Sequence, residues 1–185
     1  MEFVLKDGIH TTIAETLYND ILTNRSVYHY FVGGAYVDGQ PYSMVAHDTY
    51  KYELATRNES LSFKRVASSD VSFVVDRYDW LSGEVYDMFD DYYSPTYPSA
   101  TGATALNKAK FYVMTDQFNV YKCLHNNEGV PSTVKPTGTA PTRFKTADGY
   151  VWKFMYTVPL VARNKFMNNK FIPVQTALMQ PFYSN

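Results

Sequence analysis

Acidic and aromatic side chains are interleaved in one segment, DRYDWLSGEVYDMFDDYY, which runs from Asp76 to Tyr93. Two carboxylates beside aromatic rings are what a glycoside hydrolase needs for its acid, its base and its sugar platform. Asp79 and Asp87 are the pair on which such a hydrolase would be built. The pair must face each other across a substrate, yet these acids lie on one short stretch dotted with turn residues. The pattern therefore favours surface turns and salt bridges over catalysis.

Metal, phosphate and dinucleotide sites have no matching pattern in the chain. The acids do not have the spacing of a calcium loop, which needs a glycine at its sharp turn. The histidines do not form the His-x-x-x-His pair of a zinc site and are scattered, at His10, His29, His47 and His125. Phosphate-loop, dinucleotide-binding and nucleophile-elbow motifs do not occur. We therefore expect no enzyme, no cofactor, no metal and no small-molecule substrate.

Composition narrows the classes of partner. The chain has 185 residues with 17 basic and 18 acidic side chains, a net charge of −1 and no run of either sign, so we expect no nucleic-acid partner. The start lacks the pattern of a signal peptide, and no apolar run approaches the ~20 residues of a membrane span, so we expect no membrane partner. The single cysteine, Cys123, lies in a strand-like run, where a buried thiol is the default.

Aromatic residues make up 17% of the chain, with 17 Tyr and 12 Phe. Tyr combines a broad contact area with a polar tip and a low entropy loss on burial, which favours it in sheets and at protein interfaces. Sugar-binding surfaces use the same property. The composition thus leaves open a protein-contact role and a carbohydrate-binding role.

The first part of the chain predicts a helix followed by strands. Ile9, Ile13, Leu17 and Ile21 recur every four residues, which predicts an amphipathic helix over 7–23. The run at 26–39 reads as a strand, a tight turn at Gly33-Gly34 and a short strand. We expect a short helix or helical turn over 47–58. A strand, a Ser-Ser-Asp turn and a second apolar run should follow within 60–80.

The second part predicts strands separated by long loops. The segment 90–107 is rich in Ser, Thr, Pro, Gly and Tyr without periodicity, so it should be an exposed loop. Two strand-like runs on either side of Asp116-Gln117 predict a hairpin. The long polar stretch 125–149 is more typical of a binding arm than of a tether. One further short strand is possible at 171–174.

One strand after the Asp148-Gly149 turn carries aromatic residues at strict two-residue spacing. Residues two apart share a face of a strand, so Tyr150, Trp152, Phe154 and Tyr156 should form one wall of a core. Pro159 should end the strand. The sequence as a whole predicts a mainly β (α+β) fold with antiparallel, β-sandwich-like sheets, an N-terminal amphipathic helix and long loops. It is one unit over 1–185, or two sub-domains at 1–75 and 76–185.

Five sequence blocks carry a resemblance to a known family. They are LYNDILTN, VYHYFVGG, VVDRYDWLSGEVYDMFDD, FYVMTDQFNVYKCL and ADGYVWKFMYTVP, in that order, and the last three are the most specific. Together they resemble the baseplate wedge protein (gene product eight) family of T4-type contractile-tailed phages. The resemblance implies a non-enzymatic virion protein of the tail baseplate, assembled in the host cytoplasm. It also implies a homodimer that packs against other wedge proteins.

The resemblance supplies no catalytic or cofactor residues. In a protein of this kind we expect the loops 92–105 and 125–147 to contact the neighbouring proteins. Members of this family usually continue well past the position equivalent to Tyr183, so we expect the chain to be a short version or the N-terminal portion of a longer protein. The alternative function is a carbohydrate-binding or receptor-binding module of a phage tail, with exposed Tyr and Trp as sugar platforms. Aromatic or extended residues in the two loops are the predicted interface residues: Tyr92, Tyr93, Tyr97, Val134, Lys135, Pro136 and Phe144.

Overall fold

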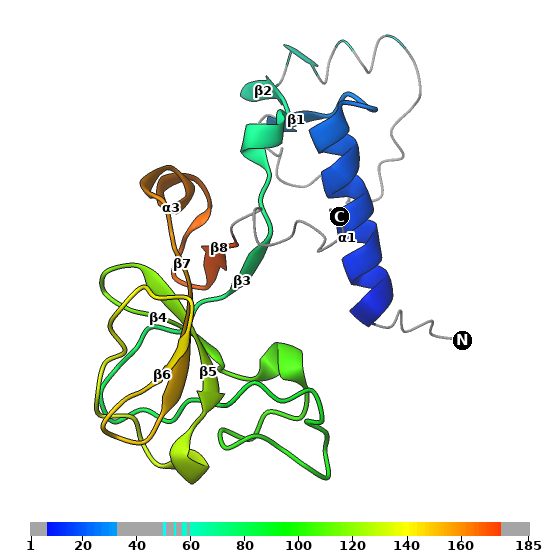
Figure 1. Cartoon of the computed structure of the whole chain (residues 1–185). Helices are drawn as coiled ribbons and strands as arrows, with labels where there is room; N and C mark the ends of the chain where they lie inside the picture. Colours follow the sequence, from blue (N-terminus) through cyan, green and yellow to red (C-terminus); the bar gives the residue numbers. More distant parts are fainter. Residues whose placement is uncertain (1–6, 33–49, 51–53, 55–56, 59, 175–185) are drawn as a thin grey trace, which may run out of the picture. The chain divides into compact units, whose positions relative to one another are not determined.

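The computed structural model describes residues 7–32, 50, 54, 57–58 and 60–174 (Figure 1). The chain divides into two compact units, Met1–Val71 and Ser72–Asn185. Antiparallel strand pairs dominate the described part, together with a helix near the N-terminus, so the predicted mainly β (α+β) class is confirmed. No helix in the described part of the chain is both long and apolar enough to cross a membrane.

The N-terminal unit contains one helix and one two-stranded ribbon. Helix α1 spans Asp7–Thr23, as the four-residue periodicity predicted. Strand β1 (His29–Val32) pairs antiparallel with β2 (Ser62–Arg65), and the predicted Ser-Ser-Asp turn is a 3₁₀ turn at Ser68–Asp70. The predicted turn and strand after residue 32 and most of the helical turn predicted over 47–58 lie outside the described residues.

The C-terminal unit is built around a four-stranded antiparallel sheet in the order β4-β5-β7-β6. The strands are β4 (Tyr112–Met114), β5 (Asn119–His125), β6 (Arg143–Lys145) and β7 (Val151–Thr157). Strands β4 and β5 form the hairpin predicted at Asp116-Gln117. Strand β6 lies within a stretch where we predicted only loop. It pairs with β7 and is an edge strand of the sheet.

Smaller elements complete this unit. Strand β3 (Val74–Asp76) pairs antiparallel with β8 (Phe171–Pro173), so the short strand predicted near residue 171 is present. Helix α3 (Leu160–Phe166) follows Pro159, which ends β7 as predicted and begins a helix that the sequence did not predict. Single 3₁₀ turns lie at Leu106–Lys108 and Asn127–Gly129.

Two clusters form the core of the C-terminal unit. One contains Tyr86, Tyr121, Cys123, Tyr150 and Trp152. The other joins the β4–β7 sheet to the β3–β8 pair and α3, and its buried members are Met114, Val120, Tyr156, Val158 and Ile172. The register of β5 against β7 shifts between Val120 and Tyr121, and such an irregularity re-aims neighbouring side chains. Because of this shift, Phe154 packs with Tyr121 against the first cluster, whereas Tyr156, two residues further along β7, lies with Val120 in the second.

The aromatic side chains of β7 pack inward, but they do not form the single wall that alternation predicted, because Tyr150 and Trp152 belong to the first cluster and Tyr156 to the second. Tyr150, Trp152 and Tyr156 are buried, and Phe154 packs against the first cluster. Gly149 makes the entry turn possible because its φ is +89°, and a Cβ there would lie 2.7 Å from the Asn127 side chain. This turn therefore positions β7, which with β5 is one of the two inner strands of the four-stranded sheet.

Candidate interaction surfaces

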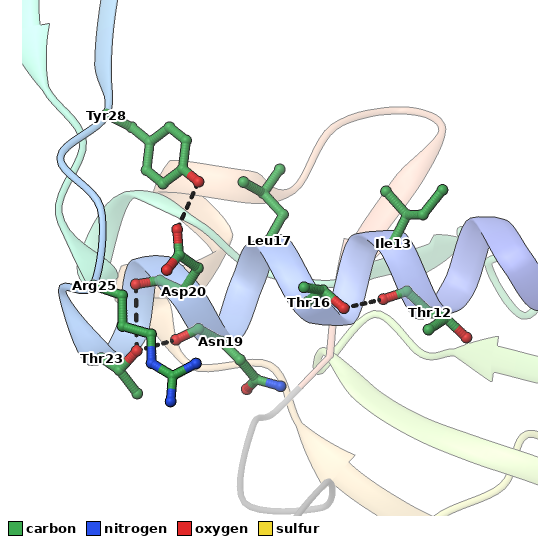
Figure 2. A pocket seen from close by; sticks show the side chains of 9 residues that line it. All are labelled: Thr12, Ile13, Thr16, Leu17, Asn19, Asp20, Thr23, Arg25 and Tyr28. Carbon is green, nitrogen blue, oxygen red and sulfur yellow. Dashed lines mark hydrogen bonds between the residues drawn. The ribbon is translucent and has the colours of Figure 1, made fainter.

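A groove of about 640 Å³ runs along helix α1 (Figure 2). Ile13 and Leu17 lie side by side on it, with exposed fractions of 56% and 46%. At its end the Tyr28 hydroxyl donates a 2.6 Å hydrogen bond to Asp20, and this bond is the main cause that lowers the pKa of Asp20. Of the predicted apolar stripe, Ile21 is buried and these two side chains are not. The groove therefore offers an apolar strip closed at one end by a fixed polar pair.

The β1–β2 ribbon exposes the side chains of both its faces. Tyr30, Phe31 and Phe63 are all exposed, and the His29 ring stacks on Phe63 with centroids 5.0 Å apart. A two-stranded ribbon in water is marginally stable by itself, because it buries too little apolar surface. We call the exposed apolar side chains of the ribbon and of the α1 groove the apolar surface of the N-terminal unit.

The tyrosines of loop 92–105 divide between surface and interior. Tyr92 is 79% exposed and Tyr97 is also exposed. Tyr93 is buried; its ring stacks with Tyr97 at 6.1 Å and its hydroxyl donates to the Met88 carbonyl at 2.9 Å. Apart from a bridge between Ser94 and Tyr97, the segment is made of turns, as predicted. The loop thus offers Tyr92 and Tyr97 to a partner, while Tyr93 holds the loop in place.

A buried carboxylate anchors the same loop. Asp87 is fully buried and accepts hydrogen bonds from the Thr101 amide at 2.9 Å, the Thr101 hydroxyl at 2.7 Å and the Lys110 amide at 2.9 Å. Both Asp87 oxygens therefore hold two points of the chain, Thr101 within the loop and Lys110 after it. A carboxylate so enclosed is poorly placed to act on a substrate, because general acid–base catalysis requires contact with the reacting group.

The predicted interface residues of loop 125–147 are also only partly available. Val134 is exposed, and Lys135 forms a 3.0 Å ion pair with Asp116 in the β4–β5 turn. Pro136 is buried, and Phe144 packs edge-on against Tyr121 with centroids 6.1 Å apart. Tertiary packing thus uses Pro136 and Phe144 inside the unit, so that of the four predicted residues in this loop Val134 is exposed and Lys135 is half-buried.

A second carboxylate, Asp148, fastens loop 125–147 to the start of β7. It accepts hydrogen bonds from the Ser132 hydroxyl at 2.9 Å, the Thr133 amide at 2.8 Å and the Val134 amide at 2.9 Å, and one from the Thr146 hydroxyl at 2.5 Å. Burial alone raises the pKa of Asp148, but these hydrogen bonds outweigh it and lower the pKa to about 2. The polar stretch predicted as an arm is therefore pinned to the sheet.

The stability of the C-terminal unit should fall in acid through Asp148. Its folded-state pKa of about 2 lies below the unfolded value of about 3.9, so its contribution is complete above that value and is lost as the pH falls through 2. Urea titrations at a series of pH values between 5 and 2 will measure this decline. Asp148→Asn should lower stability at pH 5 and flatten the decline. An unchanged slope in that variant would contradict the assignment.

The remaining candidates for chemistry are occupied or enclosed. Both Asp79 oxygens accept bonds from Arg77, at 2.8 to 3.1 Å, so the proposed hydrolase pair has one ion-paired and one buried member. Burial raises the pKa of the Cys123 thiol to about 12, which keeps it protonated. Within the residues that the structure describes, no cluster of three His, Cys, Asp or Glu side chains could hold a metal ion.

Sequence reasoning found the exposed tyrosines but missed both anchoring carboxylates. Asp148 carried a signal, because an aspartate before glycine commonly binds nearby backbone amides in turns. Asp87 carried none that separates it from its acidic neighbours. In comparisons of the sequence with known proteins, no family model and no curated protein matches this chain.

Proposed function

We propose that this chain is a structural subunit of a contractile-tail baseplate wedge, which holds neighbouring wedge and fibre-attachment proteins through protein contacts. The observation that carries the proposal is the apolar surface of the N-terminal unit. It exposes Ile13 and Leu17 in the groove and Tyr30, Phe31 and Phe63 on the ribbon, and large exposed apolar areas mark interaction sites. The order of the sequence blocks that resemble the wedge family supports this partner class.

The two pinned loops of the C-terminal unit fit the same role. A subunit that transmits force must present its contacts on a rigid frame, and preorganised loops lose less entropy when they bind. Asp87 and Asp148 fix both loops from within, so Tyr92, Tyr97 and Val134 are presented from a defined backbone. We infer that the chain acts as a homodimer in this assembly, with the apolar surface of the N-terminal unit buried in protein contacts.

The test is a charge introduced into the α1 groove, with a matched change on the same helix. Leu17→Lys should weaken dimerisation by about tenfold or more, since desolvated apolar anchors carry most interface energy. Ala14→Lys is the control, because Ala14 is exposed on α1 but does not line the groove. Native mass spectrometry of the tagged chain, pulled down from phage-infected cells, will record both its oligomeric state and any tail proteins bound at fixed ratios.

Helix content should stay the same in both variants, because lysine is a good helix former and both positions are exposed. The proposal expects wild type and Ala14→Lys to be dimeric with tail proteins attached, and Leu17→Lys to lose both. A wild-type chain that is monomeric and carries no virion protein would overturn it. Equal behaviour of the two variants would remove the α1 groove from the contact.

A further inference from the structure

Three cations lie in one row across the four-stranded sheet. Lys122 of β5 stands opposite Lys153 of β7, and Lys153 stands opposite Arg143 of β6. Directly opposed residues on one face have Cβ atoms about 4.5–5.5 Å apart. Lys145, two residues further along β6, shares the face of Arg143. The strand register thus brings together three cations that are separated in the sequence. We call Lys122, Lys153 and Arg143 the basic row.

The basic row lies on the face of the sheet that points away from the first core cluster. Lys122 alternates with buried Tyr121 and Cys123, and Lys153 follows buried Trp152. Arg143 and Lys153 are exposed, and Lys122 is half-buried. The ammonium group of Lys122 lies 3.1 Å from the ring centroid of Phe89, itself an exposed side chain. The row therefore presents charge beside one aromatic surface.

No carboxylate of the described residues neutralises this row. The ion pairs recorded among those residues belong to Lys64, Arg77 and Lys135. Like charges directly opposite each other on neighbouring strands destabilise a sheet. Burial lowers the pKa of Lys122, and the neighbouring charge of Lys153 lowers it further. The fold thus keeps a repulsive arrangement that a bound anion would relieve.

We infer that the basic row is a docking surface for a carboxylate-bearing helix of a neighbouring protein. The Cβ atoms of acidic residues at i and i+4 of a helix are about 5–6 Å apart. That spacing is close to the 4.7–4.9 Å between neighbouring strands, so a helix laid across the strands can set successive acids on successive cations. Phe89 and half-buried Val151 flank the row and fit the apolar side chains of such a segment.

A protein segment fits this surface better than a nucleic acid. Nucleic-acid-binding domains are strongly basic over a whole face, whereas this chain has a net charge of −1 and a row of three or four cations. The inference rests on the proposed function in one respect, because it takes the ligand to be a neighbouring protein. It concerns a different unit of the chain from the apolar surface tested through Leu17.

The decisive variant is Lys153→Glu in the purified full-length chain. The probe is a short fluorescein-labelled oligoglutamate, followed by fluorescence anisotropy at low and high salt. The variant should bind it at least about tenfold more weakly than wild type, because a like charge now faces the ligand's carboxylates. The same variant should melt at a higher temperature, since the new carboxylate stands between Lys122 and Arg143. A stabilised protein that loses binding cannot be explained by misfolding.

Lys170→Glu is the matched control, because it makes the same charge change at an exposed lysine of the same unit. It should leave oligoglutamate binding within about twofold of wild type, because Lys170 is not a member of the row and exposed charges outside a contact are screened by salt. Equal weakening by both variants would reduce the effect to net charge and overturn the inference. So would the absence of any binding by wild type.

A single-stranded DNA oligonucleotide of equal charge serves as the other arm. Tighter binding of DNA, lost in Lys153→Glu, would overturn the protein partner and assign the row to nucleic acid. If wild type does not bind oligoglutamate but is a dimer with bound tail proteins, the inference about the basic row is wrong and the wedge proposal stands. If the chain binds oligoglutamate but is monomeric and without tail proteins in infected cells, the wedge proposal is wrong and the assignment of the basic row as an anion-binding surface stands.

Discussion

Asp87→Ala is expected to lower the free energy of unfolding of the C-terminal unit by about 2–4 kcal/mol. The carboxylate is fully buried and accepts bonds from two donors of Thr101 and one of Lys110. Hydrogen bonds to charged acceptors are worth more than neutral ones, and donors left without a partner retain their desolvation cost. The loss should also free loop 92–105 from the sheet, because these bonds tie its end to the backbone before β4.

Urea unfolding followed by tryptophan fluorescence will give the free energy, and hydrogen exchange will report the loop directly. The amides of Thr101 and Lys110 should lose protection in Asp87→Ala before the β5 and β7 amides do. Asp91→Ala is the matched control, because Asp91 is an exposed acid in the same run and should change stability by less than about 0.5 kcal/mol. Equal stability of the two variants would show that Asp87 does not hold the loop.

The same experiment separates a structural carboxylate from a catalytic one. A hydrolase built on Asp79 and Asp87 would keep its fold in Asp87→Asn and lose only activity. The structure predicts instead that Asp87→Asn is itself destabilised. Both Asp87 oxygens accept hydrogen bonds, and asparagine replaces one of them with an NH₂ group, which would face an N–H or O–H donor. Stability, and not turnover, is therefore the property expected to respond at this position.

Elements with a strong local signal were predictable from the sequence. The four-residue apolar period predicted the bounds of α1, and alternation after Asp148-Gly149 predicted β7 and the shared face of Tyr150, Trp152 and Phe154, though not the register shift that turns Tyr156 to the second cluster. The turn at Asp116-Gln117 gave the β4–β5 hairpin. In each case the signal lies within the element or its adjoining turn, where local propensity and burial agree.

Features that depend on register or on distant packing were not predictable. Strand β6 has polar residues on either side of Phe144, and it is a strand because it pairs with β7. Tyr93 and Pro136 were placed at the surface from their loop positions, yet tertiary packing buries both side chains. The basic row exists only once β5, β7 and β6 are aligned, so net charge and charge runs carried no trace of it.

The helix stripe shows the opposite limit. Its period predicted a helix correctly, but periodicity does not say what covers the apolar face. Ile13 and Leu17 remain exposed while Ile21 is buried. An amphipathic helix whose stripe is only partly used within its own unit is what a subunit that buries surface on assembly should have. The β1–β2 ribbon has the same property, because its apolar side chains are also exposed.

Trp152→Ala should be the most damaging single change in the chain, with a loss of about 3–5 kcal/mol. Trp152 is fully buried, stacks on Tyr150 at 5.4 Å and meets Tyr86 edge-on at 5.8 Å. It stands between Cys123 of β5 and Phe144 of β6 in register, so it links three strands. Truncation leaves a cavity that stacked rings cannot fill without leaving their own contacts.

Trp152→Phe should cost well under half as much, and the reason is specific to this site. The buried indole N–H of Trp152 has no hydrogen-bond partner among the residues that the structure describes, so its removal breaks no bond there and relieves a desolvated donor. Leu160→Ala is the control, because Leu160 is exposed on α3 and should change stability by less than about 0.5 kcal/mol. Trp80 remains as the fluorescent reporter in both Trp152 variants. If the phenylalanine and alanine variants lose equal stability, ring packing is not what Trp152 contributes, and the account of the first core cluster fails.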